Sequence, residues 1–182
     1  IYAQPTFITV DITGDTEWIV EESPYVIMET ITVHDIVTLT VHPGVIIKFA
    51  SGDVSMEIQG KLLAEGTEND SIYFTSYYDD SIGGDTNDDG SFNSPSRGDW
   101  RYLYFNGADV GTSLYYCVVR YGGRAYNHSA YDKRYNSLWL NDSQVNISNS
   151  VIEESYASSY NDYPGAIYLE SNASATLTNV IV

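Results

Sequence analysis

The sequence predicts an all-β fold in which short parallel strands stack into a solenoid (β-solenoid), interrupted by one long acidic loop. Short apolar runs rich in β-branched and aromatic residues alternate with turn residues along the chain. No segment keeps the 3.6-residue period of an amphipathic helix. In the second half, two series of strands recur at a spacing of roughly thirty residues, which is typical of a solenoid with one repeat per coil.

The first half divides into a lead-in and a series of regular strands. Residues 1–23 mix apolar residues with Thr, Asp and Gly, and we interpret them as an irregular lead-in or N-terminal cap. The domain proper is expected to span residues 24–182, with an inserted loop at 77–100. Turn-like segments such as His42-Pro43-Gly44 separate its strands. The strands expected in this half are 31–33, 37–41, 45–49, 55–59, 61–64 and 71–75.

An internal repeat follows the loop. The aligned strands are 114–119, 147–152 and 177–182 in one series, and 103–105, 138–140 and 167–169 in the other. Equivalent residues of successive coils should lie side by side in parallel sheets. The alignment therefore predicts that Asn149 stacks on Asn179 and that Arg120 lies opposite Glu153.

The C-terminal end of the domain is expected to be uncapped, because the sequence stops within the apolar run Val180-Ile181-Val182. An open solenoid end exposes unpaired backbone groups and core side chains, which proteins normally cover or pair. We therefore expect self-association through the open ends, or further coils, as in a fibre, stalk or surface layer.

The acidic loop, residues 77–100, contains the first half of a calcium-binding motif. Asp85, Asn87 and Asp89 place side-chain oxygens at alternate positions, and Gly90 follows as the turn residue. The acidic residue that normally closes such a twelve-residue loop is missing, because Ser96 occupies that position.

Other aspartates of the same loop can supply the missing ligand. Asp79 and Asp80 precede the motif and Asp99 follows it, and the glycines between them allow the segment to fold back. With Asp88 the loop holds six carboxylates, which repel one another at such short spacing and need a counter-charge. The sequence therefore predicts a structural Ca²⁺ ion, with the alternative of a solvated acidic loop.

Composition limits the partners and the location. The chain has 25 acidic and 8 basic residues and a net charge of -17, which opposes binding to nucleic acid and to anionic membranes. No apolar run is long enough for membrane insertion. The single cysteine, Cys117, lies in an apolar strand and is expected to be a buried, inert thiol. Five Asn-x-Ser sequons favour a secreted or cell-surface protein, and the glycosylation candidates are Asn69, Asn127, Asn141, Asn146 and Asn172.

Several segments resemble a known family. The runs 23–28, 31–33, VTLTVHPGVIIKF at 37–49, 62–76, Gly98-Asp99-Trp100 and YCVVRYGG at 116–123 are similar to right-handed parallel β-helix domains. These pectate-lyase-like repeat domains occur in secreted and cell-surface proteins of bacteria and archaea. The resemblance covers about residues 23–123 and implies a right-handed parallel β-helix. It does not select a function, because the fold carries adhesins, stalks and polysaccharide-active enzymes alike.

We interpret the chain as an extracellular structural or adhesion module rather than an enzyme. The alternative is a polysaccharide-active enzyme, a lyase or a glycosidase, or a carbohydrate-binding module on the same fold. An enzyme would draw on Asp99 with Arg101 and Arg120, but no motif marks these residues, so no catalytic residue is assigned. Tyrosines such as Tyr102 and Tyr104 suit a surface carbohydrate, and they suit stacking along the solenoid wall equally well.

Overall fold

The fold is built almost entirely from parallel strands. The computed structural model describes residues 4–90, 92–124, 136–156 and 165–182. Regular structure in these residues consists of β-strands and one short 3-10 helix, η1 (Val20–Glu22). The strands form three parallel sheets, and the described residues contain no helix long and apolar enough to cross a membrane. The prediction of an all-β chain of parallel strands is therefore confirmed.

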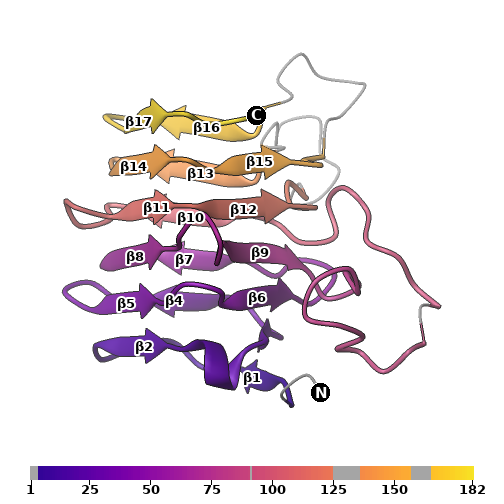
Figure 1. Ribbon diagram of the computed structural model, residues 1–182. Coiled ribbons are helices and arrows are strands. Elements are labelled where there is room, and N and C mark those ends of the chain that lie inside the picture. Colours follow the sequence, from indigo (N-terminus) through magenta and orange to yellow (C-terminus); the bar gives the residue numbers. More distant parts are fainter. Residues whose placement is uncertain (1–3, 91, 125–135, 157–164) are drawn as a thin grey trace.

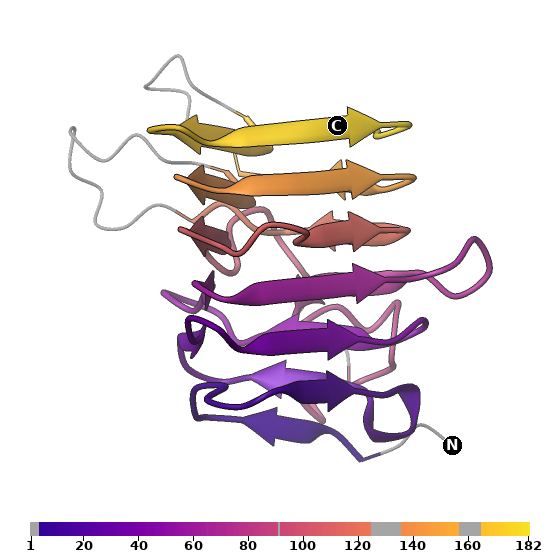
Figure 2. The ribbon, with the colours of Figure 1, turned by 90° about the vertical axis from the view of Figure 1, so that its left-hand side faces the viewer.

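From β3 onward, successive strands pass from one sheet to the next, so that each sheet takes every third strand. Sheet A contains β1 (Thr6–Ile8), β3 (Tyr25–Ile27), β6 (Ile46–Phe49), β9 (Ile72–Ser76), β12 (Cys117–Arg120) and β15 (Val151–Glu153). Sheet B contains β4 (Ile31–Val33), β7 (Met56–Ile58), β10 (Leu103–Asn106), β13 (Leu138–Asn141) and β16 (Ile167–Glu170). Sheet C contains β2 (Thr16–Trp18), β5 (Thr38–Val41), β8 (Lys61–Glu65), β11 (Ser113–Tyr115), β14 (Gln144–Ser148) and β17 (Ser174–Thr178). The resulting layers lie one above another (Figures 1 and 2), an arrangement compatible with a solenoid.

The strands expected in the first half correspond to β4 through β9, with ends that differ by at most one residue. The segment 1–23 also contributes strands. Within it, β1 pairs with β3 in sheet A and β2 pairs with β5 in sheet C. An isolated bridge joins Ile12 to Val33 of β4, so this segment contacts all three sheets.

The repeat alignment predicts the register of the later layers correctly. Leu103 pairs with Leu138, which pairs with Ile167; Leu114 pairs with Ile147, which pairs with Leu177. The expected amide contact is also present, because Asn179 Nδ2 donates to Asn149 Oδ1 at 2.7 Å. Arg120 pairs in register with Glu153, and their charged groups lie 3.8 Å apart.

One expectation about these repeats is wrong. The segments 114–119 and 147–152 each contain parts of two strands in different sheets, because the chain turns a corner within them. The corner residues are Tyr116 and Asn149, both with φ of 49°. This left-handed conformation is common for Asn but unusual for Tyr. A corner of one or two residues inside an otherwise strand-like run leaves no break in the apolar pattern, so the sequence reads as one strand.

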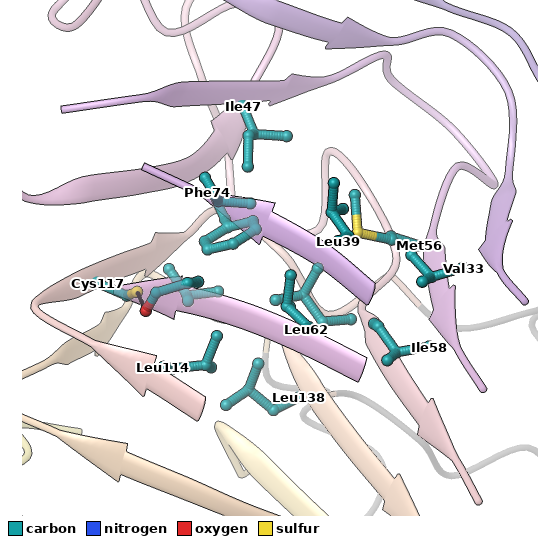
Figure 3. Packing of buried hydrophobic residues seen from close by; sticks show 14 of the residues in the cluster. Val33, Leu39, Ile47, Met56, Ile58, Leu62, Phe74, Leu114, Cys117 and Leu138 are labelled. Atoms are coloured by element: carbon teal, nitrogen blue, oxygen red, sulfur yellow. Dashed lines mark hydrogen bonds between the residues drawn. The ribbon is translucent and has the colours of Figure 1, made fainter. Parts of the chain in front are cut away.

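The inward side chains of the three sheets form one apolar core (Figure 3). Leu39 and Leu62 are fully buried neighbours in sheet C, and Ile47 and Phe74 are fully buried neighbours in sheet A. Cys117 is buried in the same core, and burial raises the pKa of its thiol. The prediction of a buried cysteine is therefore confirmed.

The last layer leaves core-facing side chains exposed. Leu169 and Leu177 are 48% and 49% exposed, whereas their in-register partners Leu140 and Ile147 in the layer before are fully buried. In the earlier layers, the following layer covers these inward positions.

Gly60, between β7 and β8, lies close to the backbone of the preceding layer. A Cβ atom there would lie 2.3 Å from the carbonyl oxygens of His34 and Val37, so the layers would have to move apart. We predict that Gly60→Ala lowers the free energy of unfolding by about 2 kcal/mol or more, measured by urea denaturation. The control is Gly14→Ala, where the added Cβ atom would have no neighbouring atom within 4 Å. This substitution should change the free energy of unfolding by less than about 0.5 kcal/mol. Equal effects of the two substitutions would contradict this packing.

Candidate metal site in the acidic loop

The inserted loop 77–100 leaves sheet A at the end of β9 and lies against the outer face of that sheet (Figure 1). Its closeness to the sheet is clearest at Gly83, where a Cβ would lie 3.1 Å from Pro24 and 3.2 Å from Ile46 side-chain atoms. Two basic residues of the sheet, Lys48 of β6 and Arg120 of β12, contact the loop.

Lys48 of β6 anchors the loop to sheet A. Its side chain is fully buried, and its ammonium donates to the carbonyl oxygens of Asp79 at 3.0 Å and Gly84 at 2.8 Å, and to Thr86 Oγ1 at 2.6 Å. Burial lowers the pKa of Lys48 to about 8, against the opposing effect of the acidic residues, of which Asp79 is the strongest. The ammonium is therefore still charged at neutral pH and binds three parts of the loop at once.

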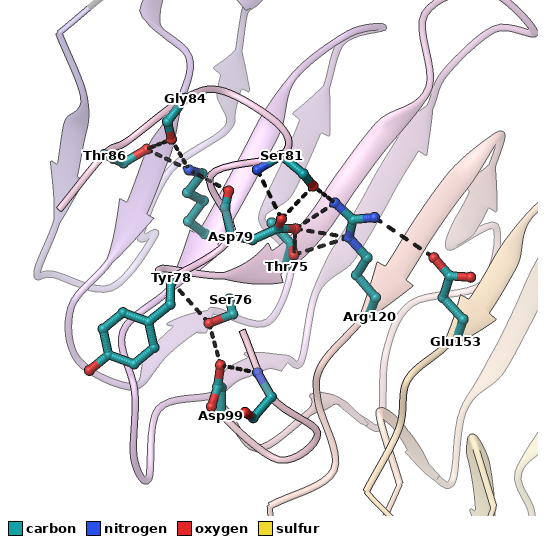
Figure 4. Close-up of polar contacts among 12 residues, drawn as sticks. Thr75, Ser76, Tyr78, Asp79, Ser81, Gly84, Thr86, Asp99, Arg120 and Glu153 are labelled. Carbon is teal, nitrogen blue, oxygen red and sulfur yellow. Dashed lines mark hydrogen bonds and ion pairs between the residues drawn. The ribbon is translucent and has the colours of Figure 1, made fainter. Parts of the chain in front are cut away.

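Asp79 fastens the start of the loop to Arg120 (Figure 4). Its carboxylate is buried, and Oδ2 accepts from Thr75 Oγ1 at 2.5 Å and from Arg120 Nε at 2.9 Å. The other oxygen, Oδ1, accepts from Ser81 Oγ at 2.6 Å. Burial raises the pKa of Asp79, but the hydrogen bonds from Ser81 and Thr75 and the charge of Arg120 outweigh it and hold the pKa below its usual value. Asp79, expected from the sequence as a metal ligand, thus has both oxygens occupied by protein donors.

Asp99 fastens the other end of the loop. Its Oδ2 accepts from Ser76 Oγ at 2.6 Å and from the backbone amide of Ser96 at 2.9 Å. Trp100 follows and is fully buried, with its ring stacked on Phe49 at 4.1 Å between centroids. The two ends of the loop are therefore tied to the strand that precedes it and to the core.

Between these anchors, three carboxylates converge. One oxygen of each of Asp80, Asp85 and Asp89 lies within 4.8 Å of the others, with Asp80 and Asp89 half-buried. Asn87 adjoins this group, because its Nδ2 donates to Asp89 Oδ2 at 2.7 Å. Within the described part of the chain, the Oδ1 atom of Asn87 is buried and accepts no hydrogen bond. We call Asp80, Asp85, Asp89 and Asn87 the carboxylate cluster.

The loop backbone orients the cluster. Asp85 accepts from the amides of Asp89 at 3.2 Å and Gly90 at 2.8 Å, and Asp89 accepts from the Phe92 amide at 2.9 Å and Asn93 Nδ2 at 2.8 Å. Desolvation raises the pKa of Asp89, but the hydrogen bonds, led by those from Asn93, lower it below its usual value. Asp89 is therefore ionised at neutral pH, and carboxylate and amide oxygens are the ligands that Ca²⁺ prefers.

Of the six predicted ligands, the structure brings four together and places two elsewhere. Asp80, Asp85, Asn87 and Asp89 adjoin one another, whereas Asp79 and Asp99 serve as the anchors of the loop. Reasoning from the sequence missed Lys48, the central anchor of the loop. The available signal was a single charged residue within the apolar run Ile46-Ile47-Lys48-Phe49, which is costly to bury unless it has partners.

The three residues considered for catalysis have different partners. Asp99 binds Ser76, Arg101 lies 3.3 Å from Asp53, and Arg120 binds Asp79. These contacts hold loops and strands together.

The aromatic residues of sheet B stack across the layers. Tyr104 and Trp139 are in-register neighbours with ring centroids 4.0 Å apart and planes 23° apart, and Tyr102 meets Trp139 edge-on. These rings therefore pack against one another along the wall of sheet B. The sequence holds further tyrosines that suit a surface carbohydrate equally well and that lie outside the described residues, namely Tyr126, Tyr131, Tyr135, Tyr160 and Tyr163.

Comparison with known proteins adds no relative. No protein-family model, curated protein or solved structure matches the chain. Its function therefore has to be argued from the geometry of the loop and the sheets.

Proposed function

We propose that the chain is a right-handed parallel β-helix that serves as an extracellular structural and adhesion module, with a Ca²⁺ ion rigidifying its acidic loop. The three stacked parallel sheets support the β-helix, and parallel crossovers are almost always right-handed. The observation that carries the calcium proposal is the convergence of three carboxylates within 4.8 Å beside the buried Asn87 oxygen.

A structural role is favoured over catalysis because the charged side chains considered for catalysis bind other parts of the protein. Asp79, Asp99 and Arg120 are engaged in hydrogen bonds that fasten the loop, which leaves them poorly placed to transfer protons to a substrate. The loop has strands rather than helices on either side, so a sensor-like opening of two helices on binding is unavailable to it. The ion would thus act as a fixed cross-link between the carboxylates.

Ca²⁺ suits this cluster because it takes six to eight oxygen ligands in flexible geometry. Asp80, Asp85 and Asp89 would supply carboxylate oxygens and Asn87 an amide oxygen, with water or backbone carbonyls completing the shell. An ion here removes the repulsion between three adjacent negative charges, and the anchors at Lys48 and Asp79 hold the loop where the ligands meet.

We predict that Ca²⁺ raises the melting temperature of the purified protein and that a chelator reverses the increase. A ligand at a hundred times its Kd stabilises the folded state by about 2.7 kcal/mol. Mg²⁺ at the same concentration is the control, because it demands a smaller octahedral site and should produce a smaller shift. Melting should be followed by circular dichroism with and without chelator.

The same preparation distinguishes the structural proposal from the enzymatic one. Incubation with anionic polysaccharides should give no product, and calcium-dependent cleavage would contradict the structural role. An unchanged melting temperature in Ca²⁺ and in chelator would contradict the calcium proposal.

A further part of the proposal is self-association or stacking against further coils. Leu169 and Leu177 occupy inward positions that are buried in the preceding layers, so a partner with an apolar layer would cover them. Light scattering over a range of concentrations tests self-association of this chain, and a monomer at the highest concentration would reject it.

A further inference from the structure

Three sequons that are far apart in the sequence come together around sheet C. Asn69 lies in the turn after β8, Asn146 within β14, and Asn172 in the turn before β17. The topology therefore places Asn146 on sheet C, Asn69 at the edge where the chain passes from sheet C to sheet A, and Asn172 at the edge where it passes from sheet B to sheet C. The acidic loop, in contrast, lies over sheet A.

The three asparagines are exposed. Asn146 points outward from the middle of β14, because its neighbours in the strand, Val145 and Ile147, are buried in the core. Its in-register partners are Ser113 and Thr176, whose short side chains leave space around the Asn146 amide. A bulky polar substituent on Asn146 would therefore extend into solvent without displacing core atoms.

The sequon at Asn141, only five residues earlier, is in a different environment. The Asn141 side chain is half-buried, and its Nδ2 donates to Asn106 Oδ1 in the neighbouring layer at 3.0 Å. The serine of this sequon, Ser143, is 2% exposed; its hydroxyl donates to the Asn141 carbonyl and accepts from the Ala108 amide. The nitrogen that a glycan would occupy is thus held in a half-buried amide contact between layers. The Nδ2 of Asn172 also has a partner, Asp142 Oδ1 at 3.3 Å, but that contact is exposed.

We propose that sheet C is the glycan-bearing face of the molecule, with N-linked glycans on Asn69, Asn146 and Asn172 and none on Asn141. In the transfer, Nδ2 forms a bond to C1 of a sugar carried on a lipid diphosphate, the bond from C1 to the diphosphate oxygen breaks, and Nδ2 gives up one proton. The inference rests on the extracellular location in the proposed function. It leaves the faces of sheets A and B, and the acidic loop, available for other contacts.

The test is site-by-site occupancy of the secreted chain. The 182-residue chain is expressed behind a secretion leader in a eukaryotic host that transfers N-glycans. Asn127, which lies outside the described residues, is replaced by Gln in every sample. Folded protein is purified and deglycosylated in heavy-oxygen water, and peptide mass spectrometry then identifies each asparagine that carried a glycan.

We expect glycans at Asn69, Asn146 and Asn172 and an unmodified Asn141. The matched variant Asn146→Gln should lose one glycan and melt at the same temperature after deglycosylation as the parent chain. A glycan on Asn141 in folded protein, or an unmodified Asn at any of the three exposed sites, would overturn the proposal. Calcium-dependent melting of the same samples is a separate readout, so failure of the calcium proposal and failure of the glycan proposal can be told apart.

Discussion

Replacing Asp79 by Ala should lower the free energy of unfolding by about 3–5 kcal/mol, the range observed when one partner of a buried ion pair is removed. The substitution leaves the guanidinium of Arg120, which is 16% exposed, without its closest carboxylate, and it removes the acceptor of the Thr75 hydroxyl. It also releases the start of the acidic loop from sheet A. Urea denaturation followed by tryptophan fluorescence measures the loss.

Glu153→Ala is the matched control for this prediction. Glu153 also approaches Arg120, but at 3.8 Å and with its side chain 47% exposed. A pair of this kind contributes about 0–1 kcal/mol. A double-mutant cycle of Asp79→Ala with Arg120→Ala should give a large coupling energy, and one of Glu153→Ala with Arg120→Ala a small one. Equal coupling would show that Asp79 is not the principal partner of Arg120.

Asp79 also makes the protein sensitive to acid. Because its folded-state pKa lies below the value of about 3.9 expected in the unfolded chain, the folded state binds fewer protons in this range. The stabilisation is complete above the unfolded-state pKa and is lost as the pH falls through the lower, folded-state pKa. Stability should therefore decline less steeply below pH 4 in Asp79→Ala than in the parent chain.

Trp100→Ala should also cost about 3–5 kcal/mol of unfolding free energy, as expected for removal of a buried tryptophan. The Trp100 side chain is fully buried, its ring lies nearly parallel to Phe49, and its Nε1 donates to the Arg120 carbonyl at 3.0 Å. Trp100 joins the end of the acidic loop to the core. Its loss should therefore destabilise the packing of the core and loosen the attachment of the loop. Equilibrium denaturation measures the change.

Trp100→Phe is the control, because it keeps an aromatic ring against Phe49 and loses the hydrogen bond. This variant should lose less stability than Trp100→Ala. If Trp100→Ala costs less than about 1 kcal/mol, the end of the loop is not anchored in the core in the way described.

The sequence predicts the layered sheets well because each layer repeats the same pattern. Leu114, Ile147 and Leu177 occupy one column, and a residue class that recurs at near-constant spacing reveals its column without any structure. Corners are harder to predict. Tyr116 turns the chain with a positive φ although its neighbours in sequence continue the strand-like pattern. The conformation is imposed by the neighbouring layers, which local sequence does not describe.

The same distinction applies to the candidate site. Asp85, Asn87 and Asp89 can be found from their spacing, because they lie on one short turn. The role of Asp79 depends on Arg120 and that of Asp99 on Ser76, and these partners are distant in sequence. Five aspartates with similar sequence surroundings therefore divide into loop anchors and cluster members only when sheet A and the loop are placed together.

The central claim, that Ca²⁺ binds the carboxylate cluster, is tested most directly by equilibrium dialysis of the purified chain against Ca²⁺. Asp85→Asn removes one carboxylate of the cluster, and Asp88→Asn is the control. Asp88 lies in the same loop with a φ of 55° that Asn tolerates, and it is outside the group of converging carboxylates. We predict that the parent chain and Asp88→Asn each bind one ion and that Asp85→Asn loses this binding. No bound ion in the parent chain, or equal binding by Asp85→Asn, would contradict the claim.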